Sequence, residues 1–457
     1  MVNPQPLRHA SVYATFGVSR REITPPVGIY SRNWGAARHD TATSVHRPLT
    51  LNALSIQSDS APLILVDADL GWWRPMSLFQ RFQSRLLNQF GLGPHQLIFA
   101  LTHTHASAPL MDPDPALPGS ELQEEWLEVV YQSAVAAIQS ALANSFTGVL
   151  EWHSGSCLLA SNRDLPEPGG ERFLCGYNPE NSADSTLVIG RLTDSVGSMR
   201  AILVNYACHP TTLAWENEAI SPDYIGAMRE TIEQATGAKS FYLHGASGEL
   251  SPKHQYVGDV EVADRHGRQL GYATLATLFD MNPACHELVY SGVMESGAPL
   301  AVWQHREYSP STKVMGSQHS IELPLKDWPT ADVLEQQRAA CEDRALQERL
   351  RRKRDIRRVL GDGTKHAVQF SAWRLGDAIL VGSSCEAYSK LQTELRARFE
   401  DRTVVCMNLI NGTIGYLPPD DKYEFDIYQV WQTPFARGSL ELIIDAMEEQ
   451  IKGLISQ

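Results

Sequence analysis

Two histidines separated by one residue are the side chains whose spacing most directly suggests chemistry. His103 and His105 lie in a Thr-His-Thr-His sequence that follows the apolar run 96–101. A short apolar run after the turn-forming stretch 91–94 predicts a buried central strand, and side chains at positions i and i+2 of an extended segment point to the same side. Neutral imidazole is the commonest protein ligand for zinc, which then needs donors from elsewhere in the chain. Two inert, hydrogen-bonded histidines at a strand end are the alternative.

Three later apolar runs of the chain are also followed by possible metal donors, namely His209, Glu386 and Tyr416. In open α/β sheets the ligand site lies beyond the carboxyl ends of the strands. Two imidazoles, a carboxylate and a phenol at such ends form a suitable set of nitrogen and oxygen ligands for zinc. We therefore expect a zinc site at the C-terminal ends of the strands.

The stretches between these runs predict helices that cover a sheet. Apolar residues recur at helical spacing in 75–90 and 121–144, and the sequence 221–224 is typical of a helix start. We expect an α/β fold with mixed or parallel central sheets covered by helices. No Ser/Gly-rich or Pro-rich linker divides the chain, so residues 1–457 are expected to form a single domain.

The stretch 331–360 differs from the rest because it is highly charged. The Arg-rich run 349–354 follows several acidic residues at spacings that suit i,i+4 ion pairs. This pattern predicts a long, exposed, solvated helix. Contact of the basic run with a partner or with lipid head groups is the alternative.

The overall composition excludes several classes of partner. A formal net charge of −14 over 457 residues argues against nucleic acid or an anionic membrane as the main partner. The longest apolar runs are too short to span a membrane, so no stable membrane insertion is expected. The seven cysteines show no CxxC spacing and the N-terminus lacks secretory features, which together predict a cytoplasmic protein.

Two loops carry further candidates for polar chemistry. Arg163 lies in a Pro/Gly-rich loop, where an arginine can bind a carbonyl or carboxylate; a solvated surface arginine is the alternative. Ser247 lies near a G-x-S-x-G pattern, but Glu249 occupies the place of its last glycine, so the nucleophile-elbow signature fails. Ser251 belongs to the same loop.

Taken in order, these motifs resemble those of the neutral ceramidases, a family of zinc-dependent amide hydrolases. The resemblance covers roughly residues 15 to 447 and is strongest to short bacterial relatives that lack the C-terminal immunoglobulin-like domain. The matching stretches are Thr102-His103-Thr104-His105, Asn162-Arg163, Cys208-His209-Pro210-Thr211-Thr212, Gly248-Glu249-Leu250-Ser251-Pro252, Glu386, Tyr416 followed by Asp420-Asp421-Lys422-Tyr423, and Tyr428.

The resemblance implies a role for each matching residue. The zinc ligands would be His103, His209, Glu386 and Tyr416. The scissile amide or the polar head of the substrate would be contacted by His105, Arg163 and Tyr428. Ser251 matches the position treated as the nucleophile in true ceramidases. The loop around this serine departs from the ceramidase pattern, so we expect a substrate more soluble than ceramide.

The expected activity is hydrolysis of an N-acyl amide of a small molecule or lipid-like substrate. Zinc lowers the pKa of bound water from about 15.7 towards about 7, and this hydroxide is preferred over Ser251 as the nucleophile. His105 would protonate the leaving amine, a role suited to a pKa near neutrality. An ester or lactone hydrolase on the same zinc site and a non-catalytic metal-binding protein are the alternatives. The sequence defines no oligomeric state.

Overall fold

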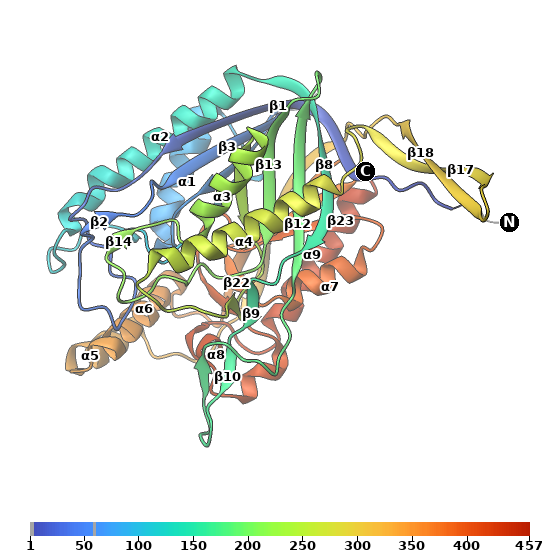
Figure 1. The fold of residues 1–457 in the computed structure, drawn as a ribbon. Helices are drawn as coiled ribbons and strands as arrows, with labels where there is room; N and C mark the ends of the chain where they lie inside the picture. The colour runs from blue at the N-terminus through green and yellow to red at the C-terminus, as the bar shows by residue number, and fades with distance from the viewer. Residues whose placement is uncertain (1–3, 58–60) are drawn as a thin grey trace.

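The chain folds around a large mixed β-sheet. The computed structural model describes residues 4–57 and 61–457. The sheet has eight strands in the order β15-β13-β12-β8-β1-β3-β4-β6, of which β1, β3, β8, β12 and β13 are labelled in Figure 1. Neighbouring strands are antiparallel, except that β13 pairs with β15 and β4 with β6 in parallel. The strands are β1 Ala10–Glu22, β3 Thr50–Gln57, β4 Leu63–Ala68, β6 Leu97–Leu101, β8 Phe146–Ser156, β12 Thr186–Asp194, β13 Met199–Tyr206 and β15 Lys239–His244.

A four-stranded sheet packs against one face of the large sheet. Leu203 and Leu243 of the large sheet share an apolar core with Leu380 and Val405 of the smaller one. Because both faces of the large sheet are covered, strands such as β4 and β6 carry continuous apolar sequences rather than alternating ones. The smaller sheet has the order β19-β20-β21-β23, with β19 Val314–Pro324, β20 Lys365–Leu375, β21 Ala378–Ser383 and β23 Thr403–Met407.

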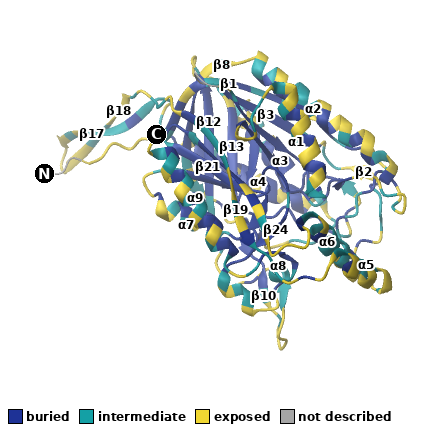
Figure 2. Cartoon of the chain, turned by 180° about the vertical axis from the view of Figure 1, so that it is seen from behind, coloured by how far each residue is buried: buried dark blue, intermediate teal, exposed yellow. Residues whose placement is uncertain are grey.

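Helices cover the outer faces of both sheets, which gives four layers. Helices α1, α2, α3 and α4 pack on the face of the large sheet that is turned away from the smaller sheet. Helices α7 and α9 cover the smaller sheet. Helices α1 and α2 each bury one side and expose the other (Figure 2), as the helical spacing of 75–90 and 121–144 predicted. These helices are α1 Met76–Phe90, α2 Gln123–Ala143, α3 Tyr224–Thr236, α4 Val260–Phe279, α7 Lys390–Arg398 and α9 Ser439–Ile455.

Short strand pairs and one hairpin complete the described part of the chain. The hairpin of β17 His286–Glu295 and β18 Pro299–Glu307 projects from the body (Figure 1). The other pairs are β2 Ser44–Val45 with β14 Ala219–Ile220, β5 Trp73–Arg74 with β7 Leu110–Met111, β9 Ala160–Asn162 with β16 Leu250–Pro252, β10 Asp164–Pro166 with β11 Phe173–Cys175, and β22 Cys385–Ala387 with β24 Gly415–Leu417.

Strand β6 lies at one end of the strand order and not at the centre of the sheet, so that prediction was wrong. Its edge is nevertheless covered. The Leu101 N–H donates to the Leu409 carbonyl over 3.3 Å, and the Asn408 N–H donates to the His244 carbonyl of β15 over 2.9 Å. The segment after β23 therefore bridges the two ends of the large sheet. Because this segment covers its edge, β6 is buried without a central position in the sheet.

The charged stretch 331–360 forms two helices, α5 Ala331–Ala340 and α6 Arg344–Leu360. The chain breaks between them at Asp343, whose side chain accepts a hydrogen bond from the Leu346 N–H and begins α6. The expectation of one exposed helix describes only the outer side of α6, because its inner side buries Glu348. Within the described ranges, no helix combines the length and apolar character needed to cross a bilayer.

Candidate metal centre

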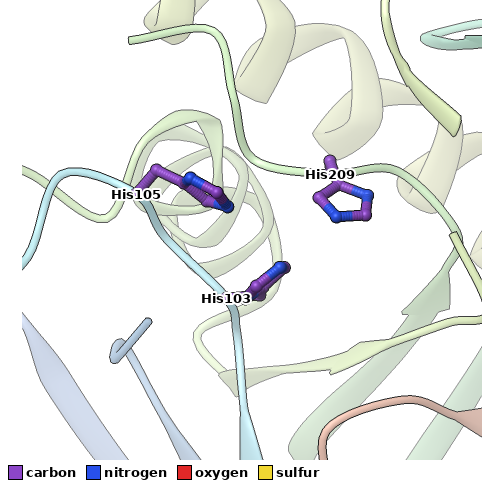
Figure 3. A group of neighbouring side chains, drawn as sticks. All are labelled: His103, His105 and His209. Carbon is purple, nitrogen blue, oxygen red and sulfur yellow. The ribbon is translucent and has the colours of Figure 1, made fainter. Parts of the chain in front are cut away.

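The three predicted histidines lie together in the folded chain. The rings of His103 and His105 have centroids 4.8 Å apart, and those of His103 and His209 are 4.9 Å apart. One ring nitrogen from each histidine lies within 4.8 Å of the others, and the rings face a common point (Figure 3). The expectation that His103 and His105 face one site is therefore confirmed.

The backbone achieves this convergence in a way that the sequence pattern did not predict. Strand β6 ends at Leu101, and His103 has a φ of +71°, in the left-handed region. Such a conformation is uncommon for a residue with a β-carbon. The two rings therefore meet because the chain turns at His103, and not because the segment is extended.

Glu386 and Tyr416 join the histidines from a separate two-stranded sheet. They are direct partners in the parallel pair β22–β24. Glu386 Oε2 lies 3.2 Å from His103 Nε2 and 3.1 Å from His209 Nε2. The ring of Tyr416 stacks on that of His209 with centroids 6.4 Å apart. The structure thus brings together the four donors that the sequence placed after strands.

The hydrogen bonds of the histidines define which nitrogen faces the centre. His209 Nδ1 lies 2.7 Å from the Ser247 carbonyl, and His103 Nδ1 lies 3.1 Å from the Gly71 carbonyl. A carbonyl oxygen only accepts, so each Nδ1 carries the hydrogen and each Nε2 presents a lone pair. Both lone pairs face Glu386, which also accepts when ionised. Acceptors directed at one another are the arrangement that a shared cation stabilises, so the chemistry of these residues fits a metal ion.

The electrostatics of the cluster favour the protonation states that metal ligands need. Burial, helped by the positive charge of Arg163, lowers the pKa of His209 to about 3. Burial alone would raise the pKa of Glu386, but His103 and His209 bring it well below its ordinary value. A neutral His209 imidazole beside an ionised Glu386 carboxylate is ready to bind a metal without first losing a proton.

His105 has an environment that differs from the expected one. Burial, and then the nearby His103 and His209, lower the pKa of His105 well below 6.5. Its Nε2 is buried and has no hydrogen-bond partner among the described residues. The expectation of a pKa near neutrality is therefore not met, and His105 presents a neutral imidazole with a free ring nitrogen.

Arg163 is buried against the centre and is not a solvated surface residue. Its Nε and Nη2 donate to the Gly248 carbonyl over 3.2 and 2.6 Å. The same Nη2 lies 3.2 Å from His209 Nε2 and 3.4 Å from the Tyr416 hydroxyl. A fixed guanidinium is thereby directed at the point where the histidine and the tyrosine meet.

Two adjoining cavities open onto this centre, and we name each after a tryptophan. The Trp72 cavity is lined by apolar and basic side chains together with the metal-centre residues. The Trp34 cavity is more aromatic and includes Arg163. Both are lined by Tyr428, and helix α6 contributes to both. Their shared lining residues are His105, Arg352, Tyr416, Tyr428 and Gln432.

Ser251 lies near the centre in the chain but lines neither cavity. It is fully buried in the pair β9–β16, opposite Ser161. Its hydroxyl has no hydrogen-bond partner among the described residues. The preceding carbonyl, that of Leu250, accepts from the His209 N–H over 2.9 Å. Ser251 is thus one residue from a backbone contact of the centre, with an unsatisfied hydroxyl.

Sequence reasoning missed the side chains that cover the centre. Trp72 packs against His105 with ring centroids 4.8 Å apart. Arg74, Arg351 and Arg352 line the Trp72 cavity. The Trp72-Trp73-Arg74 sequence, which begins four positions after the last residue of the buried strand β4, was a usable signal for Trp72 and Arg74. For α6, the only signal was that apolar Ile356 and Val359 interrupt its charged sequence.

Comparison with known structures identifies the fold as that of neutral ceramidases. The neutral ceramidase from Pseudomonas aeruginosa matches with a TM-score of 0.69 and 17% identity over 96% of this chain and 75% of its own. A ceramidase complexed with C2 matches with a TM-score of 0.68 and 15% identity over 96% and 74%. No protein-family model and no curated protein matches the sequence. The family resemblance inferred from the motifs is confirmed at the level of the fold.

Proposed function

We propose that the chain is a zinc-dependent hydrolase that cleaves the amide bond of an N-acyl small molecule or lipid-like substrate. The observation that supports this proposal most is the convergence of three acceptors, the Nε2 atoms of His103 and His209 and the carboxylate of Glu386. The ceramidase fold adds a hydrolytic precedent on the same scaffold. Residues 1–457 act as a single catalytic domain in this proposal.

The metal is assigned to zinc from the chemistry of its donors. His103, His209, Glu386 and Tyr416 would hold it, and this mixture of nitrogen and oxygen donors suits zinc better than calcium or magnesium. When bound, zinc supplies a Lewis acid that polarises a carbonyl and lowers the pKa of water to about 7. His105, the third histidine of the cluster, stays available to the substrate.

The chain's own residues orient the amide and move the protons. The guanidinium of Arg163 and the hydroxyl of Tyr428 face the cavities and donate to substrate oxygens. The neutral ring of His105 accepts a proton from the attacking water and passes it to the leaving amine. The C–N bond breaks, the amine leaves with the proton that His105 passes on, and the water oxygen stays on the acyl carbon as a carboxylic acid. This acid then ionises and releases the second water proton to solvent or to the product amine. In this proposal Ser251 does not attack, in keeping with its position outside the lining of both cavities, and its unsatisfied hydroxyl is the donor assigned to the oxyanion.

The test combines metal analysis with a substrate panel. Purified protein should contain about one zinc per chain, and chelation should abolish hydrolysis that added zinc restores. Short N-acyl amides should be cleaved faster than ceramide in detergent micelles. Acyl esters and lactones of the same chain length form the second arm. Activity on esters alone would replace the amidase with an esterase, and full activity of metal-free protein would contradict the zinc assignment.

A further inference from the structure

Three arginines, which we call the arginine cluster, lie beside the metal centre. Arg351 and Arg352 belong to α6, and Arg74 belongs to β5. All three line the Trp72 cavity, and Arg352 also lines the Trp34 cavity. Arginine side chains rarely line a buried cavity without a counter-charge, so the charge balance of the cluster is informative.

One carboxylate, that of Glu348, faces the whole cluster. It lies 2.8 Å from Arg351 Nη2, 2.9 Å from Arg352 Nε and 3.7 Å from Arg74 Nη1. Three guanidinium groups around one carboxylate leave two positive charges unbalanced. A binding site with this excess favours an anionic ligand.

The other acidic side chains of the Trp72 cavity do not supply the missing charge. Asp355 lies 2.7 Å from Arg354 Nη2 and is paired there. Glu386 faces His103 and His209 in the metal centre. The cluster therefore keeps its excess positive charge within the described residues.

Arg74 is the least satisfied member of the cluster. Its Nη2 donates to Asn33 Oδ1 over 3.2 Å, but its Nε and Nη1 are buried without a hydrogen-bond partner among the described residues. Burial, followed by the charge of Arg352, lowers the pKa of Arg74 to about 9. Buried donors in native structures normally have acceptors, so these two nitrogens point to an acceptor that a ligand brings.

Trp72 places the cluster next to the metal centre. Its ring lies 4.4 Å from Arg74 Cζ and 5.4 Å from Arg352 Cζ. The same ring has its centroid 5.7 Å from that of His103 and 4.8 Å from that of His105. A group bound by the arginines and a bond held at the histidines would thus both lie beside the Trp72 ring.

We infer that the substrate carries a carboxylate close to its scissile amide, as an N-acyl amino acid does, and that Arg74 and Arg352 bind this carboxylate. The inference rests on the proposed amide hydrolysis and specifies its substrate class. One carbon separates the amide nitrogen from the carboxylate in such a molecule, which suits two adjacent clusters. A guanidinium binds a carboxylate through parallel hydrogen bonds. The acyl chain then lies along the apolar lining of the same cavity, formed by Met76, Ile356, Val359 and Ile414.

The first experiment compares substrates that differ only in charge, using the zinc-loaded protein. N-octanoylglycine and its neutral analogue N-octanoylglycinamide share the acyl chain and the scissile bond. Charge-assisted hydrogen bonds predict a kcat/KM about 10–100-fold higher for the anionic substrate. N-octanoyltaurine, which carries a sulfonate, should be slower than N-octanoylglycine. Equal or faster cleavage of the glycinamide overturns the inference, and faster cleavage of the taurine conjugate overturns the choice of carboxylate.

The second experiment assigns the preference to the cluster. Arg74→Met should lower the ratio of the two kcat/KM values towards one. Arg344→Met is the matched control, since Arg344 lies in the same charged helix but lines neither cavity, and it should keep the ratio. An unchanged ratio in Arg74→Met overturns the assignment. If that variant does not fold, Arg74→Lys, which keeps the charge but loses the bidentate geometry, should show an intermediate ratio.

Binding separates failure of this inference from failure of the proposed function. Calorimetric titration of the protein with each compound measures the charge preference without turnover. Tighter binding of N-octanoylglycine with no cleavage of any amide or ester supports the arginine cluster as a carboxylate-binding site and contradicts the hydrolase. Cleavage of both amides with no preference in binding or rate supports the hydrolase and overturns the inference.

Discussion

The metal centre and the arginine cluster contact the same tryptophan, Trp72, but the protein holds them in different ways. His103 and His209 are oriented by the backbone carbonyls of Gly71 and Ser247. Gly71 and Ser247 are themselves buried, so the packing around them restricts their movement. The arginines are instead arranged around one side chain, Glu348, on a helix outside the sheets.

This difference indicates that bond cleavage and substrate recognition depend on different parts of one site. Bond cleavage depends on positions accurate to fractions of an ångström, which rigid strands and their backbone hydrogen bonds provide. Recognition of a charge acts over longer distances and tolerates a more adaptable arrangement. A single scaffold can therefore keep its reaction and change its substrate through the covering helix. Four changes test this division, from the largest expected effect to the smallest.

Removing a metal ligand should have the largest effect. His209→Ala should lose most of the bound zinc and reduce turnover to the background of the assay. Changing a group that merely supports a ligand costs about 10–100-fold in affinity, so loss of the ligand itself should exceed that. Inductively coupled plasma mass spectrometry measures zinc per chain. The control is His319→Ala, an exposed histidine, which should keep its metal; retention of zinc by His209→Ala would contradict the ligand assignment.

Removing the shared carboxylate should break the arginine cluster and spare the metal centre. Glu348→Gln leaves three guanidinium groups facing one another, and breaking a buried ion pair in this way typically costs about 3–5 kcal/mol. Denaturant unfolding followed by circular dichroism measures this loss, and zinc per chain should stay near that of the wild type. Loss of bound zinc together with the loss of stability would show that the two regions form one unit.

Replacing Ser251 separates the two possible nucleophiles. If its hydroxyl only supports the oxyanion, Ser251→Ala should lower kcat by about 10²–10³, or about 2.7–4 kcal/mol, and leave turnover measurable. If it attacks, an acyl-enzyme forms, and the variant should be as inactive as His209→Ala. A pre-steady-state burst or an acyl adduct on Ser251 detected by mass spectrometry would decide for the serine.

The convergence of the candidate metal-binding residues could be predicted from sequence because these residues occupy recognisable local positions. His103, His209, Glu386 and Tyr416 each follow a buried strand sequence, and strand ends in such folds meet at one edge. The backbone conformation and strand order that bring these residues together could not be predicted. An apolar sequence pattern does not indicate the left-handed backbone at His103 or the position of β6 at the end of the sheet. Both depend on the residues that pack around the strand.

The arginine cluster was not predictable for a related reason. A charged helix on a surface and a charged helix over a cavity share the same i,i+4 pattern, and only tertiary contacts distinguish them. Arg352 shows this most clearly, since its donors go to Glu348 on its own helix and to the carbonyl of Asn33, 319 positions away. The sequence predicted the first contact and contained no signal for the second.

The smallest effect is expected for Glu249, a buried acid next to the backbone that orients Arg163. Glu249 follows Gly248, whose carbonyl orients Arg163, and its carboxylate accepts hydrogen bonds from Ser389. Burial raises the pKa of Glu249 from 4.5 to about 7. The folded state therefore binds more protons than the unfolded state between these two values, and the free energy of unfolding falls as pH rises through this window. A difference of this size corresponds to about 3 kcal/mol at most.

Glu249→Gln isolates this contribution, because other buried acids also titrate. The amide keeps an acceptor for Ser389 but has no charge to bury, so the variant should be less sensitive to pH between about 4.5 and 7. Unfolding free energies of both proteins, measured by denaturant titration at half-unit pH steps, give the difference directly. The free energy of unfolding of the wild type should fall relative to that of the variant as the pH rises from about 4.5 to 7. Above pH 8 the difference between the two proteins should stay constant. A difference that is also constant from about pH 4.5 to 7 would show that Glu249 keeps an ordinary pKa in the folded chain, and that its contact with Ser389 compensates fully for its burial.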